Sequence, residues 1–174
     1  MGVRRDRRDP LIRLAKQHEA RNLADLVERA YTVYVERIGR RPAPMDDNYE
    51  ARIRDGEVFV AEESGDAVGL IVLAHRSSHL LIENVAVDPV RQGAGIGRAL
   101  LQYAERHARD LGLAEVRLYT NAAMTENLEL YPHLGYTESD RRLDHGFQRV
   151  FFCKHLSASE TSRPHCRSRE DEKL

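Results

Sequence analysis

The sequence predicts one mixed α/β domain around a mostly antiparallel sheet of six to seven strands, with helices on both faces. Three observations support this prediction. Apolar residues recur at strand-like and helix-like spacings in alternation, turn residues separate these segments, and several strand patterns follow one another directly. Consecutive strands of that kind pair antiparallel, whereas a strand–helix–strand unit gives one parallel pair. The length of 174 residues suits a single domain.

The first half of the chain predicts a strand, two helices and then three strands. Leu23, Leu26, Val27 and Ala30 recur at helical spacing, and Gly39 interrupts the pattern. The expected elements are a strand at 11–15, helices at 18–35 and 45–54, and strands at 58–62, 67–74 and 80–87.

The second half predicts two helices and three strands. Gly112 and Gly135 end the two helices, as glycine does at many helix C-termini. The expected elements are a helix at 95–111, a strand at 115–120, a helix at 125–134, and strands at 136–142 and 148–155. The strand at 80–87, the helix after it and the strand at 115–120 form the predicted parallel unit.

The strand at 80–87 is expected to be central, because both of its faces are apolar. Strict alternation places Leu80, Ile82 and Ala86 on one face and Leu81, Val85 and Val87 on the other. Glu83 interrupts this apolar pattern.

Composition predicts a soluble globular protein. Apolar residues make up 41% of the chain and charged residues 32%, and the formal net charge of −1 points to neither nucleic acid nor a membrane surface. The start of the chain lacks the apolar stretch of a secretory signal. Cys153 lies in a strand pattern and Cys166 in a polar segment, so a disulfide is not expected and a reducing cytoplasm is the default location.

The segment from 83 to 101, ENVAVDPVRQGAGIGRALL, carries the main functional signal. A strand ends at Val87, a turn follows, and glycines open a helix. Glycines let backbone N–H groups approach a ligand, and the start of a helix favours an anion. The segment therefore predicts a pyrophosphate site, to which Arg91 and Arg98 add charge.

Two common phosphate motifs are absent from this segment. The nucleotide P-loop requires Gly-Lys-Ser or Gly-Lys-Thr, which does not occur in the chain. The dinucleotide fingerprint requires a third glycine, but that position is Leu100 when counted from Gly95 and Arg98 when counted from Gly93.

A third pattern fits: Gln or Arg, two residues, Gly, one residue, then Gly or Ala, met by Gln92, Gly95 and Gly97. It resembles the pyrophosphate loop of the GNAT superfamily of N-acetyltransferases. Further along, Leu130-Tyr131-Pro-His-Leu-Gly-Tyr136 resembles the second signature of that superfamily. The superfamily often has Asn seven positions and Ala four positions before the tyrosine, where this chain has Met124 and Asn127.

The resemblance covers most of the chain and implies its domain organisation. It predicts an acetyltransferase domain at 10–156. The polar composition of 157–174 predicts a disordered C-terminal tail, and 1–9 are expected to form a flexible N-terminal tail.

The resemblance also implies the function: transfer of an acetyl group from acetyl-CoA to a primary amine by direct attack, through a tetrahedral intermediate. Acetyl-CoA would lie between the strands ending at Val87 and Thr120, and its pantetheine arm would pair with the backbone of the first of these strands. The cofactor-binding residues expected are Val85, Ala86, Val87, Gln92, Gly93, Ala94, Gly95, Ile96, Gly97, Arg98 and Asn127.

Tyr131 is the expected general acid. A phenol with a pKa near 10 is protonated at neutral pH and can protonate a departing thiolate, whose thiol has a pKa near 8.5. The alternative is an ordinary, half-buried tyrosine that packs at a helix end.

Glu83 is the expected general base, acting directly or through water. An alkylammonium must lose a proton before it attacks, and burial of a carboxylate favours proton uptake. The alternatives are a structural carboxylate paired with an arginine and a group that only orients the acceptor.

The acceptor is expected to be a small-molecule or peptide amine, lying against the first two helices. The cluster of Tyr31, Tyr34, Arg37, Arg40 and Arg41 would suit an acceptor with a carboxylate or phosphate, but solvated surface arginines explain the same pattern. His75 and His79 lie across a predicted hairpin without further ligands, so no metal site is expected.

Two rival functions remain open. One is a module of the same fold that binds acyl-CoA without turnover, against which the presence of both Tyr131 and Glu83 argues. The other is a nucleotide-dependent enzyme using Gly93–Gly97, against which the missing third glycine argues. Neither a nucleic acid nor a membrane is an expected partner, and a homodimer is left open.

Overall fold

The computed structural model describes residues 9–156, so the predictions for the two tails lie outside the described residues except at Asp9. Its elements are β1 (Leu11–Leu14), η1 (Gln17–Glu19), α1 (Ala20–Ile38), η2 (Ala43–Asp46), α2 (Tyr49–Arg54), β2 (Val58–Glu63), β3 (Asp66–His75), β4 (Leu80–Val87), η3 (Pro89–Arg91), α3 (Ile96–Asp110), β5 (Glu115–Asn121), α4 (Thr125–His133), β6 (Thr137–Asp144) and β7 (Phe147–His155).

The helix predicted at 45–54 is two elements in the structure, the 3₁₀ helix η2 and the α-helix α2. Asn48 separates them. Its side chain accepts a hydrogen bond from the Ala51 backbone N–H at 3.0 Å, which makes it the N-cap of α2. Asparagine is among the best N-cap residues, so the break is a local capping effect that the apolar spacing did not reveal.

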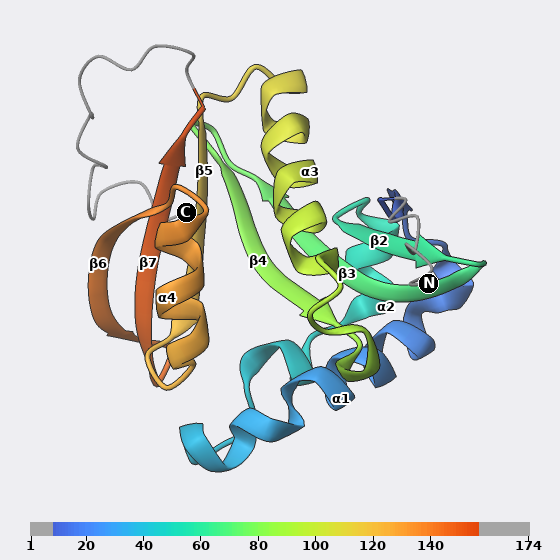
Figure 1. The fold of residues 1–174 in the computed structure, drawn as a ribbon, viewed down its shortest axis with the longest axis horizontal. Helices are drawn as coiled ribbons and strands as arrows, with labels where there is room; N and C mark the ends of the chain where they lie inside the picture. The colour runs from blue at the N-terminus through green and yellow to red at the C-terminus, as the bar shows by residue number, and fades with distance from the viewer. Residues whose placement is uncertain (1–8, 157–174) are drawn as a thin grey trace, which may run out of the picture.

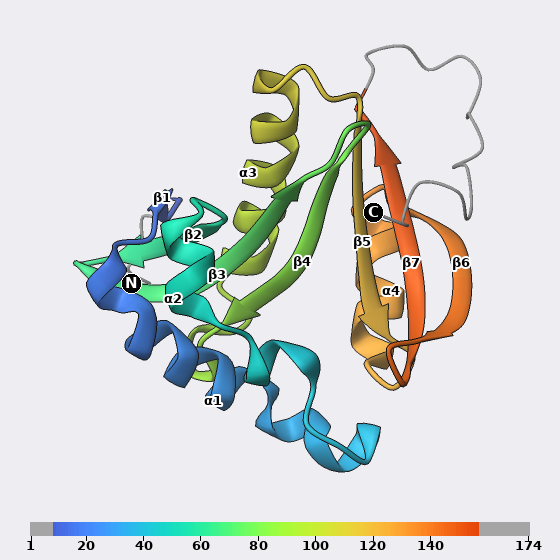
Figure 2. The same cartoon turned by 180° about the vertical axis from the view of Figure 1, so that it is seen from behind.

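One seven-stranded sheet runs through the molecule in the order β1-β2-β3-β4-β5-β7-β6. Every neighbouring pair is antiparallel except β4 and β5, which are parallel. Helices α3 and α4 cover one face, and α1 and α2 lie on the other (Figures 1 and 2). The predicted fold class is confirmed.

Strands β4 and β5 separate soon after they begin to pair. Only Leu80, Leu81 and Ile82 have partners in β5, which are residues 116–118. Beyond them the two strands diverge towards the end of the sheet that α1 crosses (Figure 1). The backbone groups on the facing edges of both strands therefore lack strand partners beyond this point.

A bulge in β4 corrects the predicted faces of this strand. Val72 of β3 pairs with Asn84 and Leu73 pairs with Ile82, so Glu83 is an extra residue without a partner. Val85 packs on the same core as Ile82, the one under α3, whereas strict alternation put these two residues on opposite faces. The prediction was wrong because one extra residue inverts the alternation after it.

Cys153 corrects another prediction. It is disulfide-bonded, and no free cysteine occurs among the described residues. The other cysteine of the sequence, Cys166, lies outside the described residues. The prediction failed because local polarity does not determine whether two cysteines approach the separation of roughly 5.5–6 Å between Cα atoms that a disulfide requires.

Gly69 in β3 lets α3 approach the sheet closely. A Cβ at this position would lie 3.0 Å from Ile96 Cγ2, 3.1 Å from the Ala86 carbonyl oxygen and 3.2 Å from Leu100 Cδ1. The carbonyl belongs to β4, so it cannot move without disturbing the strand. Any side chain at this position would push the start of α3 away from the sheet.

We therefore expect Gly69→Ala to lower the free energy of unfolding by about 1–3 kcal/mol, as overpacking does in other cores. Gly97→Ala is the matched control, because its Cβ would meet only Val87 Cγ2 at 3.6 Å, an ordinary contact. The control should be neutral or stabilising by up to about 1 kcal/mol, since alanine is the better helix former. Urea unfolding of both variants measures the difference, and equal stabilities would contradict the close approach.

Candidate active site

A cleft of about 770 Å³ lies where β4 and β5 diverge. Ligand sites of small molecules have volumes in this range. Its lining comes from α1, η2, α2, β4, the start of α3, β5, α4 and β7, so both halves of the sheet contribute. The charged residues that line it are Arg37, Asp46, Asp47, Arg52, Glu83, Glu126 and Arg149.

The glycine loop ends in an uncapped helix start. Gly93 and Gly95 have φ values of +81° and +88°, a left-handed conformation that favours glycine. Gly95 is the N-cap of α3, and no side chain caps it. The first backbone N–H groups of a helix have no partner within the helix. Four consecutive amides, from Gly95 to Arg98, are therefore available to an anion, which fits a pyrophosphate.

An ion pair and a hydrogen bond fix the chain between the end of β4 and this loop. Asp88 accepts a hydrogen bond from the Val90 backbone N–H at 3.1 Å and pairs with Arg29 at 2.7 Å. The hydrogen bond from Arg29 lowers the pKa of the Asp88 carboxyl. Arg91 pairs with Glu63 at 3.0 Å. Arg98 is exposed and makes no hydrogen bond or ion pair within residues 9–156, so it is the arginine that remains available to a phosphate.

Val85, Ala86 and Val87 line the cleft, as do Gln92 and Gly97 from the loop. The edge of β4 is not wholly open, however. The Tyr31 hydroxyl donates a long hydrogen bond of 3.3 Å to the Val85 carbonyl oxygen. One of the backbone groups expected to bind a pantetheine arm therefore already has a weak partner.

Tyr131 is the only buried residue of α4, and it lines the cleft. Its ring packs against those of Tyr136 and Phe152, with centroids 6.0 and 5.5 Å away. Its hydroxyl makes no hydrogen bond to any of the described residues. Burial raises the pKa of this phenol well above its usual value, so it stays protonated and keeps a proton to donate at neutral pH.

Glu83 lines the cleft at the bulge and lies between two arginines. Its Oε2 is 2.5 Å from Arg52 Nη2, and its Oε1 accepts a hydrogen bond from Arg76 Nη2 at 3.2 Å. Oε2 is buried and lacks a partner with hydrogen-bond geometry, in spite of the short contact. This pairing is the arrangement that the structural-carboxylate hypothesis expects. The role of Glu83 as a base stays a prediction.

Asn127 lies on the first turn of α4 and also lines the cleft. Its Nδ2 donates to Thr120 Oγ1 at 3.0 Å. Thr120 is close to the end of β5, so Asn127 ties the start of α4 to that strand. Its predicted contact with a cofactor stays a prediction.

Most arginines of the cluster predicted to face the acceptor are paired with carboxylates. Arg37 pairs with Glu126 of α4 at 2.7 Å. Arg41 pairs with Glu28 at 2.9 Å and with Asp46 at 3.0 Å. Arg40 lies over the Phe147 ring, 4.0 Å from its centroid. These contacts favour the interpretation as structural surface arginines over a site for an acidic acceptor.

A buried polar network that was not predicted from the sequence lies beside the cleft. The Tyr31 hydroxyl donates to Asn84 Oδ1 at 2.6 Å, Asn84 Nδ2 donates to the Tyr49 hydroxyl at 3.1 Å, and that hydroxyl donates to the Pro44 carbonyl at 2.8 Å. Asn84 is 5% exposed, so its amide depends on these partners. An asparagine in an apolar strand was the available signal.

Tyr119 was also missed. It lies on β5 and lines the cleft, with the Arg149 guanidinium 4.2 Å above its ring centroid. Burial is the main cause of the raised pKa of its phenol, and the charge of Glu83 adds to it. Tyr119 is therefore one of four tyrosines that line the cleft, with Tyr31, Tyr34 and Tyr131, and the charge of Glu83 influences it across the divergence of the two strands.

Within residues 9–156, no group of three or more His, Cys, Asp or Glu side chains is placed to hold a metal ion. In the same part of the chain, no helix is both long enough and apolar enough to cross a bilayer.

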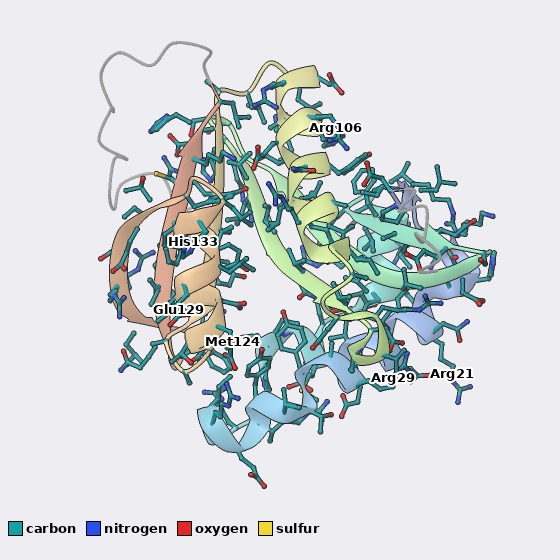
Figure 3. The ribbon with its side chains drawn as sticks, viewed as in Figure 1. Arg21, Arg29, Arg106, Met124, Glu129 and His133 are labelled. Atoms are coloured by element: carbon teal, nitrogen blue, oxygen red, sulfur yellow. The ribbon has the colours of Figure 1, made fainter. Side chains whose placement is uncertain are left out.

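In the view with side chains, Met124 lies at the end of α4 nearest α1, and His133 lies towards the other end (Figure 3).

Residues 20–136 match the family model described as the acetyltransferase (GNAT) family. The chain belongs to this family. A curated relative, the mycothiol acetyltransferase of Thermomonospora curvata, is 37% identical over 81 residues, which are 46% of this chain and 27% of the relative. The chain thus spans less than a third of the length of the curated relatives it matches first.

Solved structures of the same fold include two with the coenzyme. The PaiA N-acetyltransferase of Thermoplasma acidophilum, in complex with coenzyme A, has a TM-score of 0.70 at 15% identity, covering 85% of this chain and 99% of its own. The YncA protein of Salmonella typhimurium, with acetyl-CoA, has a TM-score of 0.64 at 21% identity, covering 91% and 100%. At these identities the likeness is one of fold.

The glycine loop predicts a binding preference. Acetyl-CoA should raise the melting temperature of the protein, and NAD and ATP should raise it less or not at all. Gly95→Asp should abolish the shift, because it places an anion where the pyrophosphate would lie. Differential scanning fluorimetry measures each shift.

Gly112→Asp is the matched control for this experiment. Gly112 follows the other end of α3, has a φ of +73° and, like Gly95, has open space around its Cβ position. Both variants therefore carry a similar backbone strain of about 1–3 kcal/mol. Loss of the acetyl-CoA shift in both variants, or a larger shift with ATP than with acetyl-CoA, would contradict the assignment of the loop.

Proposed function

We propose that the protein is an N-acetyltransferase that moves an acetyl group from acetyl-CoA to a primary amine on a small molecule or peptide. The chain belongs to this family, and the observation that supports the proposal is that one cleft brings together a site for an anion and a proton donor. The uncapped start of α3 opens beside the divergence of β4 and β5, and the protonated Tyr131 lines the same cleft.

Acetyl-CoA, as co-substrate, supplies an acyl group activated as a thioester. The amides from Gly95 to Arg98 bind its pyrophosphate, with the Arg98 guanidinium beside them. The unpaired edge of β4 orients the pantetheine arm as an added strand would. We place Gln92, Gly93, Ala94 and Asn127 in the same binding surface.

Tyr131 acts as the general acid. When the amine attacks the thioester carbonyl, a carbon–nitrogen bond forms and the carbon–sulfur bond breaks. The sulfur leaves with the electron pair and takes the phenolic proton of Tyr131. The hydroxyl is suited to this step, because its proton is not committed to a protein acceptor among the described residues.

Glu83 is our candidate for the group that accepts the proton of the attacking ammonium, directly or through water. It is the carboxylate at the bulge of β4, next to the strand edge where the thioester would lie. Its two arginine partners offer the competing role of a structural anchor. The kinetic test below separates the two roles.

A module that binds acyl-CoA without turnover is the second candidate. The uncommitted hydroxyl of Tyr131, which lines the cleft, favours an enzyme. Some curated relatives are named mycothiol acetyltransferase, but they match this chain over short segments, so the acceptor is not transferred from them. A cytoplasmic location and a homodimer stay predictions.

An acceptor screen tests the proposal. Thiol release from acetyl-CoA is measured with amino acids, polyamines, aminoglycosides and peptide N-termini. Acceptor-dependent release with one amine class, together with the mass of an N-acetyl product, supports the enzyme. Tight acetyl-CoA binding with no release on any acceptor favours the binding module.

Tyr131→Phe removes the hydroxyl and keeps the ring. We expect turnover with a verified acceptor to fall by about 10²–10⁴-fold with little loss of acetyl-CoA binding, as for loss of a general acid. Tyr103→Phe is the control, because Tyr103 packs on Phe59 and His107 and does not line the cleft. Steady-state kinetics on both variants checks the result, and wild-type turnover in Tyr131→Phe would remove the residue from the mechanism.

Glu83→Gln removes basicity at nearly constant shape. If Glu83 is the base, the acidic limb of the pH profile of activity should move or vanish in the variant. The rate deficit should also shrink at high pH, where the free amine is abundant. A pH series of kcat and KM, with Glu138→Gln as an exposed carboxylate control, measures this.

The other roles of Glu83 give different results. A raised KM with a nearly constant kcat would indicate that Glu83 only holds the acceptor by charge. An unchanged pH profile with a lower melting temperature would indicate a structural carboxylate and refute the assignment as base.

A further inference from the structure

A partly buried charge pair lies outside the cleft, between α3 and β7. Lys154 Nζ is 2.8 Å from Glu105 Oε1, and their side chains are only 25% and 11% exposed. The Tyr136 hydroxyl donates to the same Glu105 oxygen at 3.3 Å. Neither charged residue lines the cleft. Burying two charges is costly, so stability alone is a weak account of this pair.

Lys154 makes a second bond, to the end of α4. Its Nζ donates to the Leu134 carbonyl oxygen at 2.8 Å, immediately after the last residue of the helix. A cation at a helix C-terminus interacts favourably with the helix dipole. The side chain also packs on the following turn, since a Cβ at Gly135 would lie 3.3 Å from Lys154 Cε.

Helix α4 has few other means of fixing its position. It is a helix of 9 residues with a proline inside, Tyr131 is its only buried residue, and Leu128 packs on the core partly buried. Pro132 lacks the N–H that would complete the hydrogen-bond ladder of the helix. The end of α4 that carries Tyr131 therefore depends on contacts from outside the helix.

Tyr131 is directly connected to the segment that Lys154 holds. The Tyr131 carbonyl oxygen accepts hydrogen bonds from the Leu134 N–H at 3.0 Å and the Tyr136 N–H at 3.1 Å. The Tyr136 ring also meets the Tyr131 ring edge-on. A shift of the turn after α4 would thus move the phenol of Tyr131 in the cleft.

We propose that Lys154 and Glu105 position the Tyr131 hydroxyl relative to α3, the helix whose start would hold the pyrophosphate. The pair links α4, which carries Tyr131, to α3, which begins at the glycine loop. Lys154 is a positioning residue, because it acts through Leu134 and Tyr136 and does not touch the cleft. This inference rests on the proposed function, in which Tyr131 is the acid.

A double-mutant cycle tests the proposal. We expect Lys154→Met to lower kcat by about 10- to 100-fold, the loss that a displacement of about 1 Å can cause, with a nearly unchanged KM for acetyl-CoA. In a Tyr131→Phe background the same change should have almost no further effect on kcat, since no hydroxyl remains to be positioned. Equal losses in both backgrounds would overturn the proposal.

Arg13→Met is the matched control. Arg13 pairs with Glu19 and Glu62, its side chain is 21% exposed, and it lies on β1, the opposite edge strand from β6. The control should lower stability without a specific loss in kcat. A similar fall of kcat in Arg13→Met and Lys154→Met would attribute both losses to general destabilisation and contradict the positioning role.

A second measurement does not depend on activity. The protein is labelled with 3-fluorotyrosine, and the ¹⁹F resonance of Tyr131 is identified by its absence in Tyr131→Phe. We expect this resonance to shift or broaden in Lys154→Met and to stay in place in Arg13→Met. An unmoved resonance in folded Lys154→Met would overturn the positioning role.

The two measurements separate failure of the inference from failure of the proposed function. Wild-type kcat in Tyr131→Phe would remove the general acid, whereas the ¹⁹F spectrum still decides whether Lys154 positions the ring. If Lys154→Met does not fold, Glu105→Gln takes its place in both measurements. This change keeps an acceptor oxygen for Lys154 and removes the charge that anchors it to α3.

Discussion

The divergence of β4 from β5 is the constraint on which the rest of the architecture depends. Two parallel strands that stay paired leave no room between them, whereas these two pair only at Leu80–Ile82 and then separate. The separation provides a cleft in the middle of a continuous sheet and exposes backbone groups that an extended ligand can pair with. Because both walls of the cleft are strands, its shape is set by the hydrogen bonds on their outer sides, to β3 and β7.

Each wall has its own supporting helix, and the supports differ in kind. Helix α3 rests on the sheet by close packing at Gly69, which fixes the loop before it. Helix α4 buries little and is held by polar contacts at both ends, from Arg37 and Asn127 near its start and from Lys154 at its end. One wall is thus positioned by steric fit and the other by charge and hydrogen bonds, which are easier to alter without unfolding the domain.

Most of the fold was predictable from the sequence because local signals agree with the final structure. Each strand was predicted close to where it lies, mostly from apolar spacing, although β6 is largely polar, and glycines marked the ends of α3 and α4. The predictions failed where one residue or a distant partner decides the outcome. The bulge at Glu83 inverts the side-chain alternation that follows it, and Asn48 caps α2 where a continuous helix was expected. The glycine loop and Tyr131 were found from motifs, but the arginine partners of Glu83 come from segments that no periodicity connects to it.

The chain of hydrogen bonds through Asn84 has an evolutionary consequence. Its members, Tyr31, Asn84 and Tyr49, come from α1, β4 and α2, and each depends on the others. Losing one tyrosine leaves one end of the buried Asn84 amide without its partner, at a cost of about 1–3 kcal/mol. Replacing all three with apolar residues of matching size removes the buried amide itself and frees only the Pro44 carbonyl and the weakly bonded Val85 carbonyl, on residues that are not fully buried. The three positions are therefore expected to change together in evolution. Among homologues they should covary, being retained together or exchanged together, and lineages with only one or two of the polar residues should be rare.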